Sequence, residues 1–218
     1  MLYKEYEPEV LKKLQRAEVE ILKDFDALCQ KHNIDYFVCG GTAIGGVRHQ
    51  GFIPWDDDID LGMTREHYEH FLEVAEQEYG ERYKIMNADT NPDFPVTLTK
   101  WYRTGTVFRN EEMIDLGLHI GIAIDIFCFD NVADELPKFR RQAMRAWTWG
   151  KLMVLRQVGE PNIYVEGWKA KLTLLVAKLA HWGLKALHFS PKFLYGRAMK
   201  AATQYKDVHT KRVAYLFD

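Results

Sequence analysis

The stretch FVCGGTAIGGVRHQGFIPWDDDIDLGM, residues 37–63, decides the predicted fold. Acidic and apolar residues alternate near its end, which is typical of a strand buried on one face. Side chains two residues apart on a strand point to the same side, so we expect Asp58 and Asp60 to lie together, about 6.5–7 Å apart along the strand. Ile59 and Leu61 then face the core. Two such carboxylates can share a hard divalent cation such as Mg2+, or bridge two of them.

A double glycine precedes these acids. Gly40 and Gly41 stand at the start of a short predicted helix, where their bare backbone N–H groups can approach a phosphate closely. Thr42 is predicted to cap this helix and leave those N–H groups available. Arg48, near the helix end, is a better phosphate clamp than His49 because a guanidinium is always charged and forked.

The acidic run also matches the first half of a calcium-binding loop. The full loop needs Gly at its sixth position and Glu at its twelfth, where this sequence has Leu61 and His67. These two mismatches disfavour calcium-loop chemistry. The remaining alternative is a solvated acidic strand end that follows an ordinary glycine turn.

A third carboxylate is predicted in HIGIAIDIFCFD, residues 119–130. Asp125 shares a strand face with Gly121 and Ala123, which leave room for a ligand. A carboxylate among apolar strand residues is costly unless it is paired or metal-bound. Asp125 is therefore a candidate metal ligand, and the alternative is a buried structural aspartate bonded to backbone. Lys100, on a predicted strand over 97–109, is either a phosphate contact or an exposed strand lysine.

The 37–63 stretch resembles the signature of the LicD/fukutin family, a branch of the nucleotidyltransferase fold. The resemblance is dense over 37–63, thinner as far as Asn131 and weak beyond. It implies an α+β fold with a nucleotidyltransferase-like mixed sheet flanked by helices. It also implies that Asp58, Asp60 and Asp125 are the catalytic metal ligands, with Mg2+ or Mn2+ as the cofactor.

Family members resembling this sequence transfer a phosphoryl-linked alcohol onto a glycan. The group is commonly phosphocholine from CDP-choline, so we expect a CDP-alcohol donor and a cell-surface glycan acceptor, as in lipopolysaccharide or teichoic acid biosynthesis. One alternative is nucleotidyl transfer to a sugar, small molecule or protein. The other is a catalytically inactive binding module of the same fold.

Two regions are expected: a catalytic core over 1–133 and a helical region over 134–218 packed on it. Relatives usually continue with a Tyr-Gly-Asp-Tyr-like segment and a late His, so we expect a chain truncated relative to the family. With 218 residues, 47% of them hydrophobic, the chain can bury one substantial core. A formal charge of −2 does not favour nucleic acid as a partner.

The charged first residues and the scattered cysteines predict a reduced, cytoplasmic protein. Helices are expected over 8–32 and 64–79, a strand over 83–88, and only helices from Pro137 onward. Residues 164–189 combine a wide apolar face with a polar stripe of lysines and histidines. This pattern suits a helix lying on a membrane surface or one packed against protein, and the sequence leaves both open. The aromatics that could bind choline by cation–π contacts also stay open: Trp55, Trp101, Tyr102, Trp147 and Trp149.

Overall fold

The structure is a computed structural model that describes residues 6–108, 113, 115–161 and 167–217. Its chain forms two compact units, and each is described by itself. The first consists of Met1–Met86, Leu98–Asn110 and His119–Phe129. The second consists of Asn87–Thr97, Glu111–Leu118 and Asp130–Asp218.

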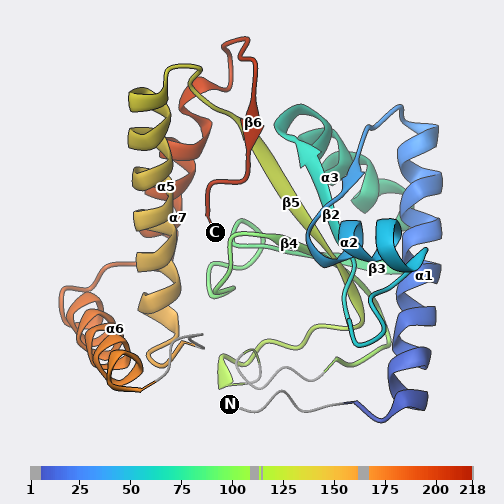
Figure 1. The fold of residues 1–218 in the computed structure, drawn as a ribbon, viewed down its shortest axis with the longest axis horizontal. Coiled ribbons are helices and arrows are strands. Elements are labelled where there is room, and N and C mark those ends of the chain that lie inside the picture. The colour runs from blue at the N-terminus through green and yellow to red at the C-terminus, as the bar shows by residue number, and fades with distance from the viewer. Residues whose placement is uncertain (1–5, 109–112, 114, 162–166, 218) are drawn as a thin grey trace. The chain divides into compact units, whose positions relative to one another are not determined.

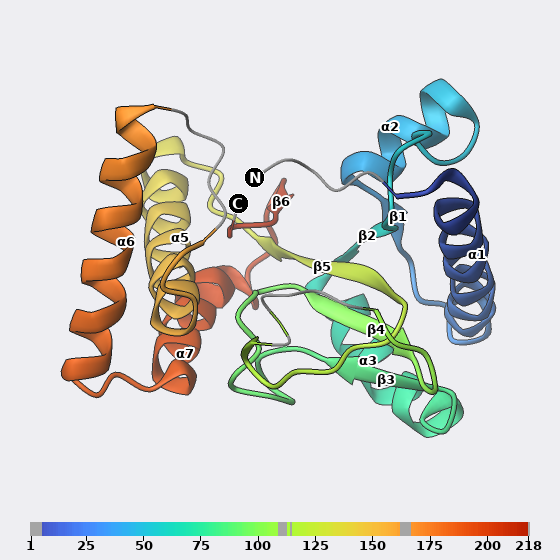
Figure 2. The same ribbon diagram turned by 90° about the horizontal axis from the view of Figure 1, so that it is seen from below.

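The first unit is built on a mixed sheet (Figures 1 and 2). Its strands follow the order β1 (Phe37–Val38), β2 (Asp60–Thr64), β5 (Ala123–Asn131), β4 (Thr99–Arg103) and β3 (Tyr83–Met86). β2 and β5 are parallel, and the other neighbours are antiparallel. This open mixed sheet with flanking helices confirms the α+β prediction.

Two long helices supply the core of this unit. The apolar stripes of α1 (Pro8–Lys31) and α3 (Arg65–Tyr79) pack with the inward residues of the strands in one cluster. Trp101 lies at its centre, fully buried and stacked on Tyr83 with ring centroids 4.1 Å apart. A shorter helix, α2 (Gly40–His49), begins two residues after β1 ends.

The strand register decides which polar residues meet. Asp60 on β2 is the direct neighbour of Asp125 on β5, and Asp125 in turn is opposite Lys100 on β4. Side chains at paired positions lie on the same face of a sheet. The alternation in β5 buries Ile124 and Ile126 fully. The polar residues of three strands therefore share the other face.

The second unit is mostly helical. It contains α5 (Leu136–Gln157), α6 (Trp168–Ala186), α7 (Pro191–Ala202), η1 (Thr203–Tyr205) and β6 (Val213–Ala214). The prediction of helices alone after Pro137 was wrong, because β6 pairs antiparallel with the end of β5. A two-residue strand has no periodicity that a sequence pattern can reveal. Within the described residues, no helix is both long enough and apolar enough to cross a membrane.

Several predicted strands are shorter in the structure. β3 ends at Met86 because the side chain of Asn87 accepts the backbone N–H groups of Asp89 and Thr90, at 3.0 and 2.8 Å, and turns the chain. Side-chain bonds of this kind compete with a strand ladder. β4 ends at Arg103, while residue 109 of the predicted strand lies outside the described residues.

Candidate active site

Asp60 is held at the start of β2 by three hydrogen bonds. Its backbone N–H donates to the hydroxyl of Thr42 at 2.8 Å, and its carbonyl accepts the N–H of Cys39 at 3.1 Å. The N–H of Gly41 donates to its carboxylate. Thr42 therefore does not cap α2 as predicted. The helix begins two residues earlier, at Gly40, and the Thr42 hydroxyl is engaged by the neighbouring strand.

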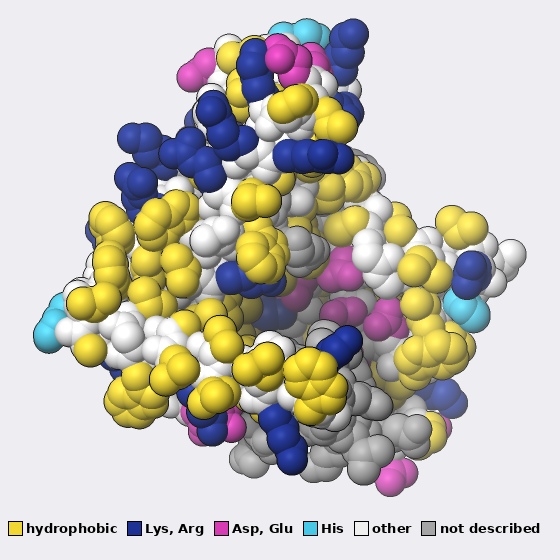
Figure 3. Space-filling view, turned by 60° about the vertical axis from the view of Figure 1, so that its left-hand side comes forward, with side chains coloured by type: hydrophobic (Ala, Val, Ile, Leu, Met, Phe, Trp, Pro, Cys, Tyr) yellow, Lys and Arg dark blue, Asp and Glu magenta, His cyan; other side chains and the backbone are white. Residues whose placement is uncertain are grey.

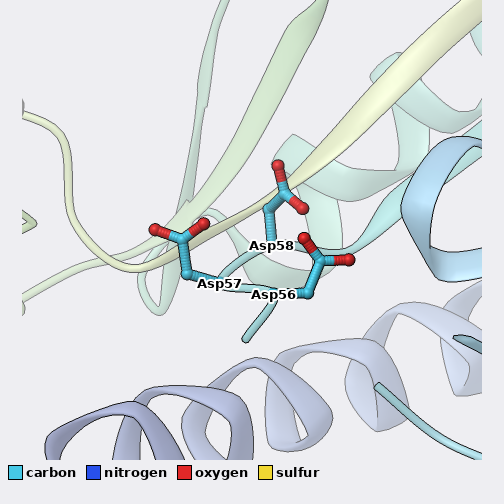
Figure 4. A group of neighbouring side chains, drawn as sticks. All are labelled: Asp56, Asp57 and Asp58. Carbon is cyan, nitrogen blue, oxygen red and sulfur yellow. The ribbon is translucent and has the colours of Figure 1, made fainter. Parts of the chain in front are cut away.

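The carboxylates of Asp58, Asp60 and Asp125 converge. Each offers one oxygen, and these oxygens lie within 4.8 Å of one another. Asp58 precedes the first residue of β2, yet its side chain still joins the pair that the strand register creates. A second group with the same spacing consists of Asp56, Asp57 and Asp58. Figure 4 shows the three side chains of this second group.

The glycine pair lies against these acids. A Cβ on Gly40 would come within 2.2 Å of Asp60 Oδ2, and one on Gly41 within 2.5 Å of Asp56 Oδ2. Gly40 also has a positive φ of 52°, in the left-handed region. Only glycine fits both positions without moving a carboxylate. The backbone at the start of α2 therefore forms one wall of the acidic site.

Lys100 supplies positive charge at the same place. Its ammonium Nζ lies 2.5 Å from Asp125 Oδ1 and 2.7 Å from Oδ2. Both side chains are largely buried, so this contact is screened less than a surface ion pair. Lys100 is therefore half-buried and ion-paired, not an exposed strand lysine, and it stands within the carboxylate cluster.

The carboxylates raise one another's pKa. Burial, followed by the charges of Asp60, Asp56 and Asp125, raises the pKa of Asp58 to about 7. Burial and the charge of Asp125 raise the pKa of Asp60 to about 6, although the N–H of Gly41 acts in the opposite direction. Like charges that share a site disfavour the ionised form. The cluster carries more negative charge than Lys100 balances.

Sequence reasoning missed Glu18, a buried residue of α1. The residue is 2% exposed, and its Oε2 has no hydrogen-bond partner among the described residues. One turn earlier, the amide of Gln15 donates to the carbonyl of Asp56 at 2.9 Å, which places this face of α1 against the acidic loop. Burial, followed by the charges of Asp58, Asp57 and Asp125, raises the pKa of Glu18 to about 9. A glutamate within a helical apolar stripe was the available signal.

Replacing Glu18 by Gln is expected to flatten the pH dependence of stability. A carboxyl whose folded pKa is raised from 4.5 to about 9 contributes most stability below pH 4.5 and loses it as the pH rises toward 9. Glu18→Gln should therefore match the parent near pH 5 and exceed its free energy of unfolding by a few kcal/mol near pH 9, on the order that burial of a charge implies. Urea unfolding with EDTA at both pH values measures this difference.

Glu20→Gln is the matched control. Glu20 lies on the same helix but is exposed and paired with Lys23 at 2.7 Å. Its replacement should leave the pH dependence unchanged, because an exposed pair contributes little. Equal slopes for Glu18→Gln and the parent would contradict the raised pKa.

The other residues predicted to contact the substrate differ in their exposure. Arg48 is exposed in the last turn of α2. Trp101 is fully buried in the core, so it cannot face a choline group. Trp55, immediately before the acidic run, is 75% exposed and remains available.

The donor set fits a hard divalent cation. Three carboxylate oxygens within one ion's reach, unbalanced negative charge and raised pKa values are what Mg2+ or Mn2+ would relieve. The chemistry of the residues present therefore agrees with the metal that the resemblance implied.

A mixed sheet with a Gly-Gly turn, an Asp-x-Asp motif beside it and a carboxylate from a later strand defines a nucleotidyltransferase-like domain. Residues 33–138 match the family model described as "LicD/FKTN/FKRP, nucleotidyltransferase domain". This part of the chain belongs to the LicD family. The predicted family is confirmed.

Three relatives show the same likeness. The chain is 38% identical over 129 residues to the lipopolysaccharide cholinephosphotransferase LicD of Haemophilus influenzae, which covers 59% of this chain and 47% of that protein. An uncharacterised protein of Rickettsia typhi is 42% identical over 68 residues, 31% of this chain and 22% of its own length. An uncharacterised protein of Rickettsia prowazekii is 43% identical over 58 residues, which make up 27% of this chain and 22% of that protein. The matches thus span about half the length of the first relative and less of the others.

Proposed function

We propose that this protein is a metal-dependent phosphotransferase that moves phosphocholine from CDP-choline to a cell-surface glycan or its precursor. The observation that carries the proposal is the convergence of Asp58, Asp60 and Asp125 beside the Gly40–Gly41 turn, within a LicD-family domain. The relative from Haemophilus influenzae, named a lipopolysaccharide cholinephosphotransferase, supports phosphocholine as the transferred group and a glycan as the acceptor.

In this reaction the bond between CMP and phosphocholine breaks and a phosphodiester to the acceptor hydroxyl forms, with release of CMP and a proton. Asp58, Asp60 and Asp125 would hold one or two Mg2+ or Mn2+ ions, which would neutralise charge on the donor's diphosphate. The N–H of Gly41 and the ammonium of Lys100 hold the carboxylates of Asp60 and Asp125 in position.

The surrounding residues position the donor. The Gly40–Gly41 backbone lies directly against the carboxylates of Asp60 and Asp56, so a diphosphate held by the acids would lie beside the start of α2. Thr42 orients the site through its bond to the backbone of Asp60. Lys100 and the exposed Arg48 supply positive charge for phosphate oxygens. Asp125 completes the ligand set, or alternatively accepts the proton of the acceptor hydroxyl.

A donor screen tests the proposal. The protein is incubated with Mg2+ or Mn2+ and with CDP-choline, other CDP-alcohols, nucleotide sugars or ATP, and the products are identified by mass spectrometry. CMP release from CDP-choline together with a phosphocholine-bearing glycan supports the proposal. Nucleotide transfer from ATP would instead identify a nucleotidyltransferase, and cation binding without turnover of any donor would identify a binding module.

Addition of Mg2+ is expected to stabilise the protein, more at high pH than at low pH. A cation binds the ionised carboxylates, so its effect should be large near pH 8 and small near pH 5, where the raised pKa values keep Asp58 and Asp60 protonated. At a free concentration about 100-fold above Kd, binding contributes about 2.7 kcal/mol, which corresponds to a rise in Tm of about 5–10 °C. Thermal unfolding with Mg2+ or EDTA measures it, and an equal shift at both pH values would contradict the site.

A further inference from the structure

α6 carries an exposed apolar face within the second unit. Its inward side is set by Ala177, which is buried, and by His181, whose Nδ1 lies 2.8 Å from the carbonyl oxygen of Leu155 on α5. The predicted polar stripe of lysines and histidines is therefore wrong for His181. The opposite side presents six large apolar residues, each 51–70% exposed: Trp168, Leu172, Leu175, Val176, Leu179 and Trp182.

These residues form a continuous stripe along the helix. Trp168, Leu172, Leu175, Leu179 and Trp182 follow one another at intervals of four, three, four and three residues, the spacing of a single helix face. Figure 3 shows hydrophobic side chains crowded on the surface in this view, with Lys and Arg among them. A monomeric protein rarely exposes so many large apolar residues together without a binding role.

Positive charge borders this stripe. Lys171, Lys178 and Lys185 are exposed and recur every seven residues along one edge, while Lys169 lies on the other. The ammonium groups of Lys169 and Lys185 lie 6.0 and 5.4 Å from the rings of Trp168 and Trp182. Lysines whose stems lie along apolar surface, next to tryptophans, are the arrangement of helices that rest in a lipid headgroup layer.

Positive charge is also concentrated in the part of the chain that contains α6. Residues 134–218 contain sixteen Lys and Arg against six Asp and Glu, whereas residues 1–133 contain thirteen against twenty-five. The formal charge of −2 conceals this separation. Asymmetry of this size points to an anionic surface as the partner of the basic part.

We infer that the exposed face of α6 binds the surface of a membrane that contains anionic lipids. A second copy of the chain fits this face less well. α6 contains no Asp or Glu, so two such faces in contact would bring lysine edges together without a counter-charge from either helix. Lys178 does contact Glu160 at 2.8 Å, but both side chains are solvent-exposed, and such a pair contributes little.

This inference goes beyond the proposed phosphotransfer and does not depend on it, because vesicle binding needs no turnover. The test is flotation of the full chain with vesicles of phosphatidylcholine alone or with added phosphatidylglycerol. We expect the protein to float with the anionic vesicles, and less at high salt. The fluorescence of Trp168 and Trp182 should shift to the blue on binding, a shift that Trp168→Phe and Trp182→Phe together remove.

Two variants separate the contributions. Lys171→Gln, Lys178→Gln and Lys185→Gln combined should weaken binding by about 100-fold, since each lysine near an anionic surface is worth about fivefold. Leu175→Gln, Leu179→Gln and Trp182→Gln combined should abolish it. All six residues are exposed, so thermal unfolding should stay close to that of the parent.

The matched control removes three exposed lysines from α1: Lys12→Gln, Lys13→Gln and Lys23→Gln. It changes the net charge equally and should float like the parent. Three results would overturn the inference: no flotation of the parent with anionic vesicles, an equal loss in this control, or unchanged flotation of the apolar variant. A dimer in light scattering that the apolar variant dissociates, without vesicle binding, would assign the face to self-association.

Discussion

Replacing Asp60 by Asn is expected to lower the turnover number of the phosphotransfer by at least about 1000-fold, since loss of several kcal/mol of charge stabilisation at a metal site corresponds to that factor. Asp60 interacts with several other residues of the site. Its backbone is held by Thr42, its side chain accepts the N–H of Gly41, and its strand neighbour is Asp125. Steady-state kinetics with the donor that the screen identifies, at saturating Mg2+, measures the effect.

The loss should not come from unfolding. Burial and the charge of Asp125 raise the pKa of Asp60 to about 6, so its ionised form destabilises the metal-free protein above that pH. Asn keeps the shape and an oxygen that accepts a hydrogen bond, and it removes the charge. Urea unfolding of Asp60→Asn with EDTA near pH 8 should therefore show stability equal to or above that of the parent.

Asp57→Asn is the matched control from the same acidic run. Asp57 accepts the hydroxyl of Tyr6 at 2.7 Å and belongs only to the group formed with Asp56 and Asp58. We expect its replacement to cost less than about tenfold in rate, because its carboxylate is bonded to Tyr6 and does not belong to the group that contains Asp60 and Asp125. If Asp57→Asn lost as much as Asp60→Asn, the cation would belong to the other group. If Asp60→Asn kept its full rate, the assignment would fail.

Replacing Gly40 by Ala is expected to reduce both stability and rate. The backbone of Gly40 has a φ of 52°, which costs an L-residue about 1–2 kcal/mol. The new Cβ would also lie 2.2 Å from Asp60 Oδ2, so the carboxylate must move. We expect a loss of about 1–3 kcal/mol in the free energy of unfolding, and a rate about 100-fold lower, because a shift of about 1 Å in a positioning group costs that much.

Gly46→Ala supplies the comparison within the same helix. A Cβ there meets nothing within 4 Å, and Gly46 lies inside α2. Alanine in a helix interior should raise stability by about 0.5–1 kcal/mol and leave the rate unchanged. Urea unfolding and kinetics of both variants decide the matter. Equal behaviour of the two substitutions would show that the turn does not constrain the carboxylates.

Much of the first unit could be predicted from local patterns in the sequence. Alternation in the sequence correctly placed Ile59 and Leu61 in the core. The convergence of Asp58, Asp60 and Asp125 also agrees with the prediction, while their role as metal ligands stays a prediction. A period of two residues decides which strand face is buried, and that information is local.

The partners of these groups could not be predicted in the same way. Lys100 pairs with Asp125 because β4 and β5 align those two positions, and Glu18 meets the acidic loop because α1 packs beside it. The capping role of Thr42 and the outward position of His181 were wrong for the same reason, since both side chains are engaged by distant segments.

By itself, the sequence determined the fold class, the family, the faces of the strands and the glycine turn beside the acids. Only the tertiary structure decided which charges balance one another, that Trp101 belongs to the core, and that α6 turns its apolar stripe outward. The physical reason is separation along the chain. Periodicity records how each residue faces its own element, whereas register and packing between remote elements depend on the folding of the whole unit.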